Sequence, residues 1–208
     1  MDYRDFTFDR LTKDFGVAIC GERDMFANAP PVEASPSWLA ESLKRAGNAG
    51  FGNAKSHSER FVSPVLMELS ARNKDIFALI SGASLDLDPD HNLHGECDFI
   101  LSATRLRDFV RAPVFCIIEA TEPALDVGVV RCAAQLLGAA RFNKRENKVT
   151  PTLYGCCTSG VEWRFLRFSA NTFVLDEARY LINEPAKLLG VLQHIVDEQL
   201  VAKAVGLG

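Results

Sequence analysis

The feature that most constrains the fold is the apolar run PVFCIIEAT at 113–121. A strand with one solvated face alternates apolar and polar residues, whereas this run is continuously hydrophobic, which is typical of a strand buried on both faces. The segment 125–143 follows with an apolar stripe at helical spacing and predicts a long helix. A buried strand followed by a helix that can cover it indicates an α/β architecture.

Hydrophobic periodicity predicts the other elements of the main domain, 57–208. The expected order is helix, three strands, helix, two strands and helix, which makes a mixed central sheet flanked by helices. The turn Thr158-Ser159-Gly160 joins the last two strands. The predicted segments are a helix at 58–73, strands at 76–88 and 93–103 around a turn at 88–92, the strand 113–121, the helix 125–143, a hairpin at 152–168 and a helix at 184–205.

The first part of the chain, 1–56, differs from the rest in composition. The stretches 28–37 and 46–54 are rich in proline, glycine and small polar residues and are typical of loops. Between them a short helix is expected at 38–46, with Ser37 as its N-cap. We interpret 1–56 as an N-terminal arm or cap on the main domain.

Bulk properties exclude several classes of protein. The 208-residue chain is 48% hydrophobic and 24% charged, as in soluble globular proteins, and its net charge of −4 argues against a broadly basic nucleic-acid-binding surface. No apolar run approaches the roughly 20 residues of a membrane helix, so no membrane association is expected. The six cysteines form no CxxC pair, which argues against a zinc site and predicts reduced thiols in a cytoplasmic setting.

Two strands of the predicted sheet carry carboxylates. Alternation places Asp98 on one face of its strand with Ile100, and places Glu119 on one face of the next strand with Phe115 and Thr121. If the strands are neighbours, the two carboxylates meet and repel each other unless a cation lies between them or one is protonated. Such hard oxygen ligands suit Mg²⁺ or Mn²⁺. The alternative is that each acid is solvated or paired with a basic side chain.

The stretches GECDFILSA at 95–103 and PVFCIIEAT at 113–121, followed by a helix that contains AAQLLGAARFN, resemble the PD-(D/E)xK, or restriction-endonuclease-like, superfamily. The resemblance covers about 58–168 and extends to the hairpin YGCCTSGVEWRFLRF. It implies a core of helix, three strands, helix and strand. It also implies a metal-dependent phosphodiesterase, a nuclease whose substrate is expected to be DNA.

The resemblance assigns roles to individual residues. It implies that Asp98 and Glu119 bind the metal, that Glu68 is an acidic partner on the preceding helix, and that Gln135 completes the site from the following helix. The family's catalytic lysine lies two residues after the glutamate, where this chain has Thr121. The chain also lacks the proline that usually precedes the aspartate.

The threonine separates two interpretations of function. Because Thr121 carries no charge, it cannot replace a lysine, and losing one preorganised donor typically costs on the order of 10²–10³ in rate. Arg131, four residues before Gln135, is either a substitute cation or a solvent-facing helix residue. The chain is therefore either a nuclease, whether fully active or degenerate in activity, or an inactive nuclease-fold protein that acts in binding or assembly. A homodimer or another protein partner is an open expectation.

Overall fold

The computed structural model describes residues 3–33, 38–49, 53–85, 93–121, 125–148 and 150–204. Helices predominate before β2, and most of the strands follow in two runs separated by α5. Their bounds are η1 (Tyr3–Asp5), α1 (Phe8–Phe15), β1 (Ala18–Glu22), α2 (Trp38–Asn48), α3 (Ala54–His57), η2 (Ser58–Val62), α4 (Ser63–Arg72), β2 (Ala78–Ser84), β3 (Glu96–Ser102), β4 (Val114–Ala120), α5 (Leu125–Arg145), β5 (Leu153–Thr158), β6 (Glu162–Ser169), β7 (Thr172–Asp176), β8 (Tyr180–Leu181) and α6 (Pro185–Ala204).

The strands form one mixed sheet in the order β1-β7-β6-β5-β4-β3-β2, with β8 paired to β6. The pairs β4–β5 and β1–β7 are parallel, and the other pairs are antiparallel. The strand β4 lies in the interior of the sheet, and six of its seven residues are buried. This confirms the predicted α/β architecture with a mixed sheet flanked by helices.

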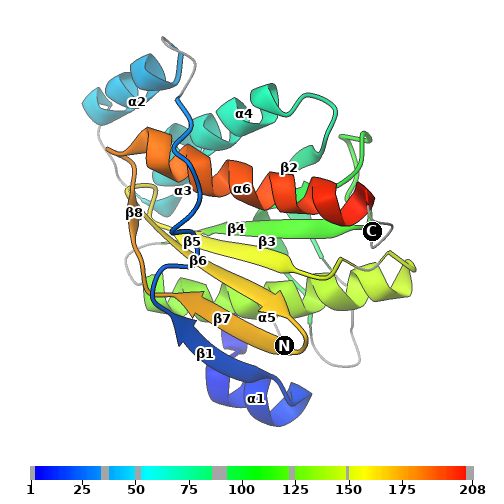
Figure 1. Cartoon of the computed structure of the whole chain (residues 1–208). Coiled ribbons are helices and arrows are strands. Elements are labelled where there is room, and N and C mark those ends of the chain that lie inside the picture. The colour runs from blue at the N-terminus through cyan, green and yellow to red at the C-terminus, as the bar shows by residue number, and fades with distance from the viewer. Residues whose placement is uncertain are drawn as a thin grey trace.

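Helices cover both faces of the sheet and make three layers (Figure 1). On one face α4 and α6 pack on the sheet, with Leu66 and Leu192 in the same core as Phe115 and Ile118. On the other face α5 lies along the sheet, and its apolar residues share a second core with Ile117. The two cores explain why β4 is apolar throughout.

Most of the predicted elements of the main domain are confirmed, and the expected 38–46 helix is α2. In the hairpin turn between β5 and β6, Gly160 has a φ of +85°, which favours glycine. Ser37 and the expected turn at 88–92 lie outside the described residues. The short strands β1, β7 and β8, near one edge of the sheet, were not predicted from the sequence.

The segment 1–56 contributes to the sheet itself. Its helix α1 starts at the N-cap Thr7 and ends at Gly16, whose φ of +65° is the left-handed conformation of a glycine C-cap. The strand β1 follows and pairs with β7 as the edge strand. Because Leu11 and Leu39 are completely buried, this expected arm shares the hydrophobic core of the molecule.

Simple alternation fails at two strand positions. Alternation predicts that Phe115 and Ile117 share a face, but Phe115 packs in the core beneath α4 and α6, whereas Ile117 packs in the α5 core. The β3–β4 register shifts at Leu101/Ser102, which breaks the alternation in this part of β4. Cys97 packs in the α5 core with Ile100, although alternation places them on opposite faces. The expected shared face of Phe115 and Glu119 is therefore wrong.

Two further observations concern the chain as a whole. Across the described ranges, no helix combines the length and hydrophobicity needed to cross a membrane. All six cysteines are free thiols, and all except Cys20 are buried. Burial raises the pKa of the Cys116 thiol, which keeps it neutral and suited to packing.

Candidate functional site

The site begins where β3 and β4 separate. Backbone pairing between them reaches Phe99 and Ile118, and the next residues are Asp98 and Glu119. Beyond this point a side chain continues the contact between the strands, because Oδ2 of Asp98 accepts a hydrogen bond of 2.8 Å from the backbone N–H of Ala120. The two strands therefore bring the predicted carboxylates together at the point where the sheet opens.

Glu119 is completely buried and is held from α5. The Gln135 side chain donates a 2.8 Å hydrogen bond from Nε2 to Oε2 of Glu119. The guanidinium of Arg131 forms an ion pair with the other oxygen, with 2.6 Å between Nη1 and Oε1. Among the described residues, Oε1 of Glu119 accepts no hydrogen bond, so the guanidinium of Arg131 interacts with it through charge alone. Arg131 thus neutralises one carboxylate of the pair.

Arg131 is correspondingly withdrawn from solvent, with a side chain that is only 19% exposed. Arg131 and Gln135 lie four residues apart on α5, and both side chains reach the backbone carbonyl of Glu96, at 3.4 and 3.3 Å. The solvent-facing interpretation of Arg131 is therefore wrong. The buried Nε of Arg131 and Oε1 of Gln135 have no hydrogen-bond partner among the described residues.

The pKa of Glu119 is raised to about 8, mainly by burial and secondly by the negative charge of the neighbouring Asp98. Arg131 and the hydrogen bond from Gln135 act in the opposite direction, because both favour the charged carboxylate. One guanidinium balances only one of two adjacent carboxylates. Burial is the largest cause of the raised pKa, and a proton on Glu119 also removes its repulsion with the charged Asp98.

Thr121, at the position of the family's lysine, is packed against α5. Its N–H donates to the carbonyl of Thr158 over 2.8 Å. A Cβ added to Gly128 would lie 2.5 Å from the Thr121 methyl carbon and would overlap the Cys157 sulfur. Gly128 therefore leaves the space that Thr121 and Cys157 fill, and a long cationic side chain at 121 would have to leave this contact.

Glu68, the expected helical acid, pairs within its own helix. It is buried, and Nε of Arg72 donates to its Oε1 over 2.9 Å. Arg72 also donates to the backbone carbonyl of Glu33. Glu68 is therefore paired with Arg72. Of the predicted site residues, Asp98, Glu119 and Gln135 lie close together.

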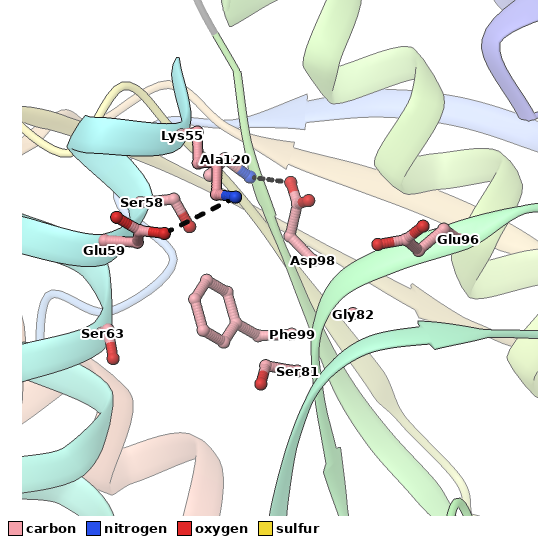
Figure 2. A pocket seen from close by; sticks show the side chains of 10 residues that line it. All are labelled: Lys55, Ser58, Glu59, Ser63, Ser81, Gly82, Glu96, Asp98, Phe99 and Ala120. Carbon is pink, nitrogen blue, oxygen red and sulfur yellow. Dashed lines mark hydrogen bonds and ion pairs between the residues drawn. The ribbon is translucent and has the colours of Figure 1, made fainter. Parts of the chain in front are cut away.

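A cavity of about 570 Å³ opens beside Asp98, between β2–β3 and the helical segment α3-η2-α4. Figure 2 shows Phe99 pointing from β3 toward the helical wall, and Lys55 beside Glu59 on that wall. Lys55 Nζ lies 3.9 Å from Glu59 Oε1. The lining residues are Lys55, Ser58, Glu59, Ser63, Ser81, Gly82, Glu96, Asp98, Phe99 and Ala120.

The helical wall of this cavity was not predicted from the sequence. Lys55 lies within the segment interpreted as an arm, and Glu59 follows it by one helical turn. This spacing is a signal for a charged pair on one helix face, but it does not indicate that the face lies opposite Asp98. That proximity depends on the packing of α3 and η2.

The arrangement of Asp98 and Glu119 does not fit a bound Mg²⁺ or Mn²⁺. Arg131 and Gln135 engage the two oxygens of Glu119, and Ala120 engages one oxygen of Asp98. Within the part of the chain that the structure describes, no group of three or more His, Cys, Asp or Glu side chains is placed to hold a metal ion. Arg131 already supplies a positive charge at Oε1 of Glu119, where a metal ion would place a second one.

Comparison of the chain with protein-family models, curated proteins and solved structures finds no match.

Proposed function

We propose that this chain is a catalytically inactive protein of the restriction-endonuclease-like fold that acts in binding or assembly. The observation that carries the proposal is the 2.6 Å ion pair between Arg131 and the buried Glu119. A metal-dependent nuclease needs this carboxylate as a ligand, and here it already has a cationic partner supplied by the chain. The order α4, β2, β3, β4, α5, β5 supports the fold assignment, since the resemblance implies that order.

The contacts of Thr121 support the loss of hydrolysis. Phosphoryl transfer depends on positioned positive charge that stabilises the transition state. The side chain at 121 is uncharged and packs on Gly128 and not on the cavity. The charge of Arg131 is committed to Glu119, so it offers little to a phosphate that approaches from the cavity.

The proposal is tested by incubating the protein with single- and double-stranded DNA and RNA in Mg²⁺ or Mn²⁺. We expect no cleavage by the wild type and no gain of cleavage in Thr121→Lys. Asp98→Ala is the matched control, because a trace nuclease from the expression host would persist in it. Cleavage by the wild type that disappears in Asp98→Ala would overturn the proposal.

A second candidate is the metal-dependent phosphodiesterase that the resemblance implies. The observation that favours it is the cavity, which places Lys55 opposite Asp98. Lys55 is loosely held by Glu59 at 3.9 Å, so its ammonium group is a substitute for the lysine missing at 121. This candidate predicts cleavage that is lost in Lys55→Ala and retained in Lys44→Ala, which changes an exposed lysine on α2.

A further inference from the structure

The end of the sheet away from Asp98 carries a concentration of basic side chains. The strand β4 begins at this end and runs to the carboxylate site, and its seven residues span about 20 Å. Three segments meet there: the turn after α4, the β3–β4 loop at 103–113, and the end of α5 with the turn that follows. We call this surface the basic end.

Specific contacts hold the three segments together. Arg107 of the β3–β4 loop donates to Asp75 of the turn after α4 over 2.9 Å. Asn143 of α5 exchanges hydrogen bonds with both backbone groups of Val114, at 2.8 and 2.6 Å. The backbone carbonyl of Asn143 also accepts a 2.8 Å hydrogen bond from the backbone N–H of Lys148, which closes the turn after α5. The charges of these segments therefore act on one surface.

Exposed basic side chains outnumber acidic ones on the basic end. The basic residues are Lys74, Arg105, Arg107, Arg111, Lys144, Arg145 and Lys148, and the acidic residues are Asp75, Asp108 and Glu146. Arg107 pairs with Asp75, and Arg145 lies 3.5 Å from Glu146. Within the described ranges, Arg105, Arg111 and Lys148 take part in no ion pair. This local excess contrasts with the net charge of −4 for the chain.

The β3–β4 loop also presents apolar side chains between its arginines. Phe109 is 64% exposed and Leu106 is 58% exposed, and both lie within the run Arg105–Arg111. Guanidinium groups bind phosphate oxygens well, and an exposed aromatic ring can stack on an unpaired base. A duplex hides its bases in the stack, so an aromatic platform among arginines favours a single strand.

We propose that the basic end binds single-stranded nucleic acid, with Arg105 and Arg111 contacting phosphates and Phe109 stacking on a base. This inference names the partner for the binding role proposed above and rests on it. In the cavity near the other end of β4, the acids Glu59, Glu96 and Asp98 outnumber Lys55 and repel phosphates, which leaves the basic end as the favourable approach. Binding requires no metal and no part of the cavity.

The test is fluorescence anisotropy with a labelled 20-nucleotide single strand of DNA or RNA in buffer containing EDTA, over a series of salt concentrations. We expect binding that weakens with salt, and a salt slope smaller by roughly 1.4 in Arg105→Ala/Arg111→Ala, since each lost phosphate contact removes about 0.7. Phe109→Ala is expected to weaken single-strand binding about tenfold. Its effect on a duplex of the same sequence is expected to be small.

Arg45→Ala is the matched control, because Arg45 is an exposed arginine on α2 whose side chain is 78% accessible. Circular dichroism melts check that all variants are folded. Absence of binding, binding unchanged in the basic-end variants, or Phe109-dependent binding to phosphatidylserine vesicles in place of single strands would each overturn the inference.

The two proposals fail separately. Because EDTA removes divalent ions, metal-dependent cleavage does not affect the anisotropy result. Cleavage in Mg²⁺ would overturn the proposed inactivity and leave the binding result intact. Absence of binding in EDTA would overturn the role of the basic end and leave the ion pair at Glu119 as evidence for inactivity.

Discussion

Arg131 Nη1 lies 2.6 Å from Oε1 of the completely buried Glu119 and so places a permanent positive charge beside a carboxylate that the surrounding core shields from water. Arginine is well suited to this position, because its guanidinium stays protonated in proteins. The pair joins α5 to β4 at the point where β3 and β4 cease to pair.

Replacing Arg131 with Met should destabilise the fold strongly. Glu119 would keep its burial and the neighbouring Asp98 and would lose its cation, and removing one partner of a buried pair costs about 3–5 kcal/mol. The loss should be largest near pH 9, where Glu119 is charged, and smaller near pH 6, where it is protonated. Urea unfolding at the two pH values measures both effects.

Arg179→Met is the matched control for this substitution. Arg179 pairs with Glu162 at 2.9 Å, but both side chains are more than a third exposed, so the loss should stay below about 1 kcal/mol. Equal losses in the two variants would contradict the importance of the buried pair.

The pH dependence of stability should carry the signature of Glu119. Its pKa is about 8 in the fold against an ordinary value of 4.5 for glutamate, so between these values the folded protein holds a proton that the unfolded chain has released. Stability therefore falls as the pH rises through this window, by up to about 1.4 kcal/mol per pH unit from this group. Glu119→Gln removes the titration. The difference between wild-type and variant unfolding free energies should change with pH, and a constant difference from pH 5 to 8 would refute the shift.

Removing the charge of Asp98 should lower the pKa of Glu119. After burial, Asp98 is the largest cause that raises this pKa, so Asp98→Asn relieves the repulsion and leaves Arg131 in place. The ¹³C chemical shift of the Glu119 carboxyl group, followed against pH, measures the change. Glu22→Gln is the control, because Glu22 pairs with Arg167 on the β1 side of the sheet. A Glu119 pKa that is the same in Asp98→Asn and in Glu22→Gln would contradict the coupling.

Gly128→Ala should destabilise the fold although alanine favours helices. The added methyl group would meet Thr121 and Cys157, and overpacking of this kind costs about 1–3 kcal/mol. Thermal or chemical unfolding measures the effect. Gly47→Ala in α2 is the control, because nothing lies within 4 Å of its added Cβ, and it should raise stability by up to about 1 kcal/mol. Similar behaviour of the two variants would show that Gly128 is not a packing position.

Local pattern was enough to predict the central part of the fold. The continuous apolar run at 113–121 indicated β4, and helical periodicity indicated α5 and α6, because burial on both faces or along one stripe leaves a direct mark in the sequence. The strands β1 and β7 were missed. They are five residues long, and their pairing depends on partners that are distant in the chain.

The site was predicted in part. Strand alternation predicted that Asp98 and Glu119 would meet if their strands were neighbours, and the resemblance to the PD-(D/E)xK superfamily added Gln135. Tertiary structure alone decided that Arg131 pairs with Glu119, that Glu68 pairs with Arg72, and that Lys55 faces Asp98 across a cavity. Spacing can place a charged side chain on a helix face, but only the packing of that face against the sheet determines which opposite charge it meets and how strongly burial shields the pair from water.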